Sequence, residues 1–182
     1  MESFDIMQAP LEIERKFLIA YPDIDALRAM PGYRVRHISQ TYLEADGAFA
    51  GGRIRRIEED GRVSYVYTFK RKISEMTRHE YERELTRDEY LELKKRQKAD
   101  TITIEKDRHL FRYAGLVYEL DVYSFWDDRA TLEAEVDSED REIPIPPCVE
   151  LIKEVTTDRR YNNSRLAKNR GVIGDSLLTG EA

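Results

Sequence analysis

The sequence predicts an α+β fold that is built on a mainly antiparallel β-sheet with a few short helices. Short segments in which apolar and charged residues alternate with period two recur along the chain, as expected for strands. Most of these segments are separated by connections of hairpin length, which join antiparallel neighbours. The chain has 182 residues and shows no internal repeat or linker, so we expect a single domain spanning residues 1–182.

Eight strands and three helices account for most of this pattern. A helix is expected over residues 21–30, with Asp23 as its N-cap. A second is expected over residues 86–100, where Thr86 and Glu89 have the spacing of a capping box. A third is expected over residues 162–169. The predicted strands are residues 12–19, 39–44, 53–59, 63–72, 78–85, 101–111, 116–125 and 130–138.

The charged residues of the predicted strands are segregated by sign. Side chains at positions i and i+2 share one face of a strand, and here such pairs carry either two acids or two bases. Any single pair is typical of a solvated face, but like charges side by side repel, and the opposite faces are strongly apolar. Lys16 extends the first strand's charged face, and Arg78 precedes the fifth's. The pairs are Glu12/Glu14, Glu80/Glu82, Glu119/Asp121, Glu133/Glu135, Arg53/Arg55, Lys70/Lys72 and Lys106/Arg108.

A sheet with this pattern in every strand can close into a barrel whose inner face is charged. Such a lumen is costly to desolvate unless it holds compensating ions. Clustered carboxylates without Cys or His partners favour Mg²⁺ or Mn²⁺, and clustered Arg and Lys favour a polyanion. A ligand that consists of a phosphate chain and a bound metal ion would need the clustered carboxylates and the clustered Arg and Lys together. No glycine-rich phosphate loop is present, so side chains would have to hold the phosphates.

The motif EIERK at Glu12–Lys16 resembles the ExExK signature of the CYTH superfamily, the triphosphate tunnel metalloenzymes. The motifs QTYL, RIRR, TFKRK, RHEYE, EKDR, YELDVY and LEAEV resemble further strand motifs of the family in its order, and KEVTTDRRYNNSRLA resembles its C-terminal segment. The resemblance covers residues 11–168. It implies an eight-stranded antiparallel closed β-barrel that forms a tunnel, with helices packed outside.

The resemblance also implies roles for individual residues. Glu12, Glu14, Glu133 and Glu135 would bind the metal, with Asp121 as a further ligand or a supporting residue. Glu14, Lys16 and Glu82 would act in catalysis, and either Glu14 or Glu82 would accept a proton from water. Glu154 is expected to brace a tunnel lysine. The phosphate path would be lined by Lys16, Arg53, Arg55, Lys70, Arg78, Lys106 and Arg108.

The function that follows is metal-dependent hydrolysis of the terminal phosphate of a triphosphate. Inorganic tripolyphosphate is the expected substrate, because the chain has no appended domain and no evident pocket for a base, and resembles the family's small bacterial form. Thiamine or nucleoside triphosphates are alternative substrates. Two different functions also stay open, those of a class IV-type adenylate cyclase and of a non-catalytic polyphosphate-binding module.

Composition restricts the partners and the compartment. A net charge of −6 argues against general affinity for nucleic acid or membrane surfaces. The single cysteine, Cys148, allows no internal disulfide, and no signal peptide or membrane-length apolar run is visible. We therefore expect a cytoplasmic protein that binds a small-molecule triphosphate. A homodimer is compatible with the sequence.

Overall fold

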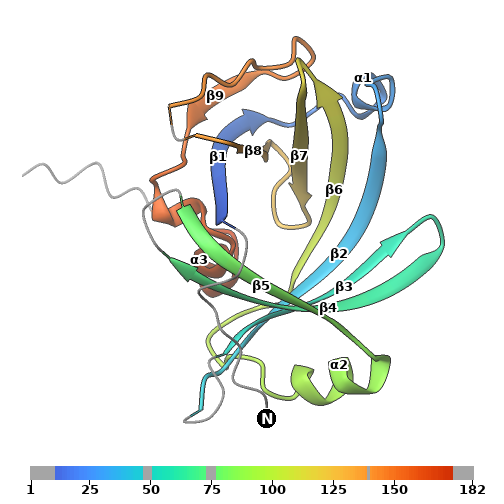
Figure 1. The fold of residues 1–182 in the computed structure, drawn as a ribbon, viewed down its shortest axis with the longest axis vertical. Coiled ribbons are helices and arrows are strands. Elements are labelled where there is room, and N and C mark those ends of the chain that lie inside the picture. The colour runs from blue at the N-terminus through green and yellow to red at the C-terminus, as the bar shows by residue number, and fades with distance from the viewer. Residues whose placement is uncertain (1–10, 47–50, 73–76, 139, 174–182) are drawn as a thin grey trace, which may run out of the picture.

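The computed structural model describes residues 11–46, 51–72, 77–138 and 140–173; the side chains of residues 11, 12, 70–72 and 77–79 lie outside this description. Within these ranges, nine strands and three α-helices make up the fold (Figure 1). They are β1 (Leu11–Ala20), α1 (Ile24–Arg28), β2 (Arg34–Leu43), β3 (Gly52–Glu59), β4 (Arg62–Lys72), β5 (Thr77–Leu85), α2 (Arg87–Lys94), β6 (Ile104–Tyr113), β7 (Leu116–Tyr123), β8 (Arg129–Val136), β9 (Leu151–Glu154) and α3 (Asn163–Asn169).

All nine strands form one sheet with antiparallel pairing. The strand order is β5-β4-β3-β2-β6-β7-β8-β1-β9, and the sheet curls strongly (Figure 1). The first half of β1 also pairs with β5, with Glu12 opposite Arg78. The second half of β1 pairs along the same edge with β9. The expected antiparallel sheet is confirmed. The sequence predicted eight strands, and the structure has a ninth, β9, within the described residues. With four residues, β9 is too short to show a period-two pattern.

The register of the sheet places the charged residues of several strands on one face. Lys16 of β1 lies opposite Glu133 of β8, and Glu14 lies opposite Glu135. Residues directly opposite each other in an antiparallel pair share a face. Glu119 of β7 is opposite Glu133 in turn. The alternation within each strand therefore continues across the strands.

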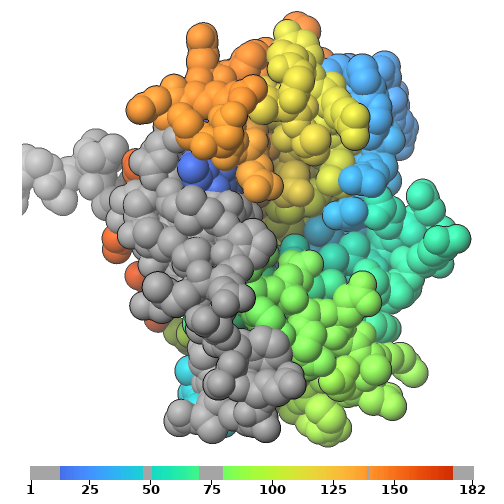
Figure 2. All heavy atoms as spheres, in the orientation of Figure 1, coloured from blue at the N-terminus to red at the C-terminus, as the bar shows by residue number. Residues whose placement is uncertain are grey.

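The other face of β1, β6, β7 and β8 is the main apolar core. Phe17, Tyr118 and Leu132 are buried there, and α1 adds Leu27. The segment after β8 covers the same face, with Ile143 and Val149 in the cluster. Figure 2 shows this orange segment lying against the yellow β6–β7 hairpin. These apolar residues leave the charged face of the strands free for a site.

The N-caps of α1 and α2 and one hairpin follow the predicted local rules. The Asp23 side chain accepts hydrogen bonds from two backbone N–H groups of α1, and Thr86 and Glu89 form the expected capping box of α2. Asp60 and Gly61 make the β3–β4 turn with φ angles of 51° and 74°, which a two-residue hairpin of this type requires. The second helix ends at Lys94 rather than at residue 100, because the following backbone bonds to the end of β2. None of the helices in the described ranges has the length and apolarity to cross a membrane.

Candidate functional site

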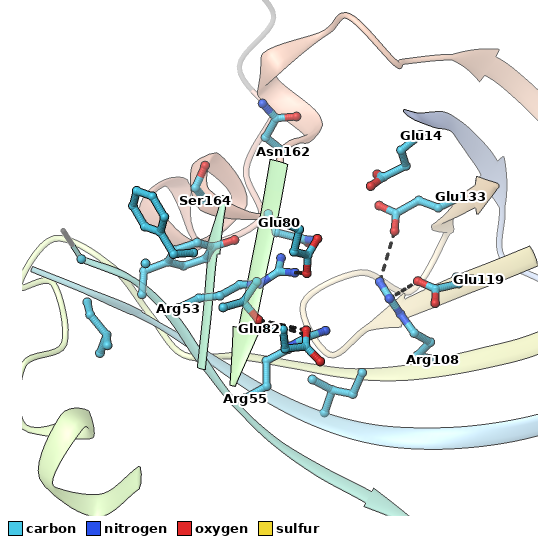
Figure 3. Close-up of a pocket in the computed structure, with 18 of the residues that line it drawn as sticks. Glu14, Arg53, Arg55, Glu80, Glu82, Arg108, Glu119, Glu133, Asn162 and Ser164 are labelled. Atoms are coloured by element: carbon cyan, nitrogen blue, oxygen red, sulfur yellow. Dashed lines mark hydrogen bonds and ion pairs between the residues drawn. The ribbon is translucent and has the colours of Figure 1, made fainter. Parts of the chain in front are cut away.

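The charged face of the sheet lines a cavity of about 540 Å³. Figure 3 shows two groups of side chains that point into it, one around Arg108 and one around Arg53 and Arg55. Acids and bases are intermixed in the lining, as expected for a site that holds an anion together with a cation. The charged lining residues are Glu14, Lys16, Arg36, Arg53, Arg55, Glu80, Glu82, Lys98, Arg108, Glu119 and Glu133.

Arg108 of β6 is the centre of the first group. Its Nε and Nη2 donate to the two carboxylate oxygens of Asp121, each at 2.7 Å. Its Nη2 also donates to Glu133 Oε2 at 3.1 Å, and its Nη1 donates to Glu119. A bidentate guanidinium–carboxylate pair fixes the plane of the guanidinium. Asp121 therefore holds Arg108 in a defined orientation at the cavity wall.

Lys16 and Glu133 form a buried pair in the same group. Lys16 Nζ lies 2.8 Å from Glu133 Oε1. Burial alone lowers the pKa of Lys16, but Glu133 and other nearby groups, Glu14 among them, outweigh burial and raise it. Burial likewise raises the pKa of Glu133, but the positive charges of Lys16 and Arg108 hold it at about 2. Both side chains are thus charged at neutral pH.

Arg53 and Arg55 of β3 form the second group, with acids from β5. Arg53 Nη2 lies 3.8 Å from Glu80 Oε1, and Arg55 Nη2 donates to Glu82 Oε2 at 2.5 Å. Burial and the neighbouring charge of Arg53 lower the pKa of Arg55 to about 10. The Nε atoms of both arginines are buried and have no hydrogen-bond partner within the described part of the chain. Buried donors without partners are rare in native proteins, and their burial closes these two off from a ligand in the cavity.

The C-terminal segment supplies uncharged polar groups to the cavity. Thr156, Asn162, Asn163 and Ser164 line it, and Figure 3 shows Asn162 and Ser164 on the segment that leads into and through α3. Thr156 anchors this segment to β1, because its Oγ1 accepts from the Lys16 N–H at 3.0 Å. No charge pattern marks these positions in the sequence, and only the folded chain brings them to the site.

Glu154 has a different partner from the one expected. Its carboxylate accepts from Arg15 Nε and Nη2 at 2.5 and 2.7 Å, and from Thr156 Oγ1 at 2.6 Å. The expectation that Glu154 braces a tunnel lysine was therefore wrong. Arg15 points away from the cavity, because it alternates with Glu14 and Lys16 along β1. These hydrogen bonds between Arg15, Glu154 and Thr156 instead hold the C-terminal segment against β1, the strand that carries the ExExK motif.

The structure brings many, but not all, of the expected site residues together. Glu14, Lys16, Arg53, Arg55, Glu82, Arg108 and Glu133 line the cavity. Lys106 and Asp121 do not line it; their side chains are almost fully buried and form an ion pair with each other. Glu135 is exposed and also lies outside the lining. The side chains of Glu12, Lys70 and Arg78 lie outside the described residues; in the backbone, Glu12 pairs with Arg78, and Lys70 pairs with Glu80.

Two basic residues of the lining were missed in the sequence. Arg36 belongs to β2, which begins at Arg34, five residues before the predicted strand. Arg34 and Arg36 have the same i, i+2 spacing as the other basic pairs, so a longer predicted strand would have found them. Lys98 follows α2 and reaches the cavity because the Lys98 N–H bonds to Tyr42 O at the end of β2.

The buried Lys16–Glu133 pair predicts a specific loss of stability in acid. Because the folded pKa of Glu133 is about 2 and its ordinary value is 4.5, its contribution is complete above pH 4.5 and is lost as the pH falls toward 2. We expect this group to contribute roughly 3 kcal/mol to the free energy of unfolding. Urea unfolding of the wild type and of Glu133→Gln, at several pH values with a chelator present, measures it. Equal pH dependence of the two proteins between pH 4.5 and 2 would contradict the prediction.

The comparisons with known proteins agree with this geometry. The family model for the CYTH domain matches residues 10–160, so the chain belongs to the CYTH domain family. A solved structure described as the inorganic triphosphatase NE1496 is similar, with 28% sequence identity, a TM-score of 0.53, and coverage of 86% of this chain and 94% of that one. PH1819 from Pyrococcus horikoshii OT3 has the same fold at 22% identity and a TM-score of 0.53, covering 71% of this chain and 80% of that one. No curated protein matches significantly.

Proposed function

We propose that this protein hydrolyses the terminal phosphate of a triphosphate with Mg²⁺ or Mn²⁺, and that inorganic tripolyphosphate is its substrate. The observation that carries the proposal is the cavity of about 540 Å³, in which Lys16, Arg53, Arg55 and Arg108 lie among carboxylates. The inorganic triphosphatase NE1496, 28% identical over 86% of this chain, supports the same reaction. Family membership is compatible with it.

We also propose that the first eight strands close into a tunnel around the substrate. The pairing of β1 with β5 supports closure, because these two strands are otherwise far apart in the strand order. In a closed ring, the charged face of each strand would be the inner face. A triphosphate in this space would be surrounded by side chains from several strands and shielded from bulk water.

The arginines and Lys16 would hold the phosphate chain. A guanidinium group has five N–H donors, and an ion pair with one glutamate uses only some of them. Glu82 accepts from Arg55, and Glu80 lies near Arg53, so these acids orient the two arginines while other donors remain for phosphate oxygens. In the group around Arg108, Lys16 and Arg108 would offset the negative charge of the phosphate chain.

The donor chemistry of the site fits a divalent cation. Glu14 lines the cavity, and Glu135 lies opposite it on β8. Among the residues that the structure describes, no three acidic, histidine or cysteine side chains are grouped as a metal site. Mg²⁺ is commonly held by one or two carboxylates together with substrate phosphates and water, so such a group is not required. Glu12, Glu14 and Glu135 would hold the ion, whereas Glu133 is already bonded to Lys16 and Arg108.

Hydrolysis in this site would depend on positioning and charge neutralisation. Phosphoryl transfer needs an in-line nucleophile and stabilisation of charge on the phosphate oxygens more than it needs covalent catalysis. A bound divalent ion would supply charge neutralisation and water activation. Lys16, Arg53, Arg55 and Arg108 would fix the substrate. A lining carboxylate, Glu14 or Glu82, would accept the proton of the attacking water.

The two β3 arginines give a test of substrate binding. Arg53→Gln and Arg55→Gln are each expected to weaken tripolyphosphate binding about tenfold or more, because each loses charge-assisted hydrogen bonds to phosphate. Arg56→Gln is the matched control, since Arg56 alternates to the opposite face of β3 and pairs with Glu58. Isothermal titration calorimetry measures the dissociation constants. Equal affinity of Arg55→Gln and Arg56→Gln would contradict the assignment.

The experiment that tests the function is product analysis with parallel substrates. The purified protein is incubated with Mg²⁺ or Mn²⁺ and with tripolyphosphate, ATP or thiamine triphosphate. Phosphate and pyrophosphate, released fastest from tripolyphosphate, are the expected result. Faster hydrolysis of ATP or thiamine triphosphate would overturn the substrate assignment. Cyclic AMP from ATP would identify a cyclase, and tight binding without turnover would overturn the proposed hydrolysis.

A further inference from the structure

Tyr123 has a buried hydroxyl group that lies just behind the wall of the cavity. It is the last residue of β7, its side chain is 1% exposed, and it does not line the cavity. Its ring packs against Phe125 and Trp126 at centroid distances of 5.1 and 5.0 Å, which fixes the position of the hydroxyl. Burial raises the pKa of Tyr123 above its ordinary value, so the phenol keeps its proton and acts as a hydrogen-bond donor.

The Tyr123 hydroxyl has three polar neighbours but only one proton to donate. Its oxygen lies 2.8 Å from Asn163 Oδ1, 3.2 Å from Thr131 Oγ1 and 3.5 Å from Asp121 Oδ2. The Asp121 oxygen is the most distant of the three, and it already accepts hydrogen bonds from two basic side chains. The Thr131 hydroxyl can donate its own proton to the phenol oxygen. The Tyr123 proton therefore goes to Asn163 Oδ1.

Asn163 connects this buried hydroxyl to the cavity. It is the first residue of α3, its side chain is half-buried, and it lines the cavity. A carboxamide has one acceptor oxygen and one NH₂ group with two donors. Because Oδ1 accepts from Tyr123, the orientation of the amide plane is fixed, and Nδ2 has no hydrogen-bond partner within the described part of the chain. Two oriented N–H donors are thus left for a ligand in the cavity.

We propose that the Nδ2 group of Asn163 binds a phosphate oxygen of the substrate, and that Tyr123 is the positioning residue that orients it. The inference rests on the proposed function, because it adds a contact to the same triphosphate. A hydrogen bond to a charged phosphate oxygen is stronger than one between neutral groups. An amide that is already oriented loses less conformational entropy when it binds. Tyr123 itself does not line the cavity, so its effect on binding passes through Asn163.

A double-mutant cycle tests both roles. The dissociation constant for inorganic tripolyphosphate is measured by isothermal titration calorimetry with a chelator present, so that metal-dependent turnover does not occur. Asn163→Ala is expected to weaken binding about tenfold, because it removes the donors. Tyr123→Phe is expected to weaken binding about threefold, since it keeps the ring and releases the amide. In the Asn163→Ala background, Tyr123→Phe should have no further effect, because the group that it orients is gone.

Two matched controls separate this effect from a general loss of packing. Tyr118 lies on the opposite face of β7, and its buried hydroxyl donates to the Pro144 carbonyl. Tyr118→Phe therefore also removes a buried tyrosine hydrogen bond, but it should keep the wild-type affinity. Asn169→Ala removes an exposed asparagine at the other end of α3 and should likewise leave the affinity unchanged.

Three results would count against the inference, and they are distinguishable. If the wild type binds tripolyphosphate and Asn163→Ala binds it equally well, the inference is wrong and the proposed function stands. An equal effect of Tyr123→Phe in both backgrounds would show that Tyr123 does not act through Asn163. A wild type that does not bind tripolyphosphate would contradict the proposed function itself, and the inference with it.

Discussion

Glu14→Gln is expected to lower kcat for tripolyphosphate by about a hundredfold or more, with no loss of the folded state. Glu14 lines the cavity, and its negative charge acts on the neighbouring Lys16. The substitution keeps the shape of the side chain and removes its charge. Because Glu14 belongs to none of the apolar clusters, the change does not open a cavity in the core.

Two measurements separate the role of Glu14 in metal binding from its role in the fold. Mn²⁺ binding, followed by electron paramagnetic resonance, should weaken along with the loss of turnover. Circular dichroism and the unfolding midpoint should stay close to those of the wild type. Glu92→Gln, on an exposed position of α2, is the matched control and should retain full activity. A Glu14→Gln protein with the wild-type rate would rule out the proposed site.

Asp121→Asn is expected to lower the free energy of unfolding by about 3–5 kcal/mol, the usual cost of breaking a buried ion pair from one side. Asp121 is fully buried, and its carboxylate bonds both Arg108 and Lys106. Burial favours the neutral acid, but the charges of Arg108 and Lys106 lower the pKa of Asp121 below its ordinary range. The amide would leave two buried cations without their counter-charge.

Urea unfolding at neutral pH measures this loss. Asp128→Asn is a suitable control, because Asp128 is exposed and its only described ion pair is with its neighbour Arg129; we expect it to leave stability unchanged. A loss of activity is also expected in Asp121→Asn, since Arg108 would no longer be held in one orientation. Wild-type stability would show that Asp121 is not the structural support of Arg108.

Much of the secondary structure and part of the site were predictable because they depend on local chemistry. The direction of a side chain in a strand is set by the period of two, so the sequence indicated that Glu14 and Lys16 share a face, as do Arg53 and Arg55. The N-cap at Asp23 and the capping box at Thr86 follow from hydrogen bonds within a few residues. The resemblance of EIERK and the other motifs to the CYTH family is confirmed by the family match.

The partners of these charges were not predictable, because they depend on strand order and register. The same alternation that places Glu133 at the cavity also places Asp121 on the charged face. Only the folded sheet shows that Asp121 is closed off beneath Arg108 and Lys106 while Glu133 lines the cavity. Likewise, Asn162 and Ser164 reach the cavity because Thr156 and Glu154 tie their segment to β1.

The sequence by itself determined the alternating strands, the capped helices, the family, and which charges within each strand lie on one face. These properties follow from interactions between residues that are near one another in the chain, or from motifs that are read directly. The tertiary structure alone decided which acids pair with which bases and which of them line the cavity. Those properties arise from contacts between residues far apart in the sequence, where no local pattern fixes the distance.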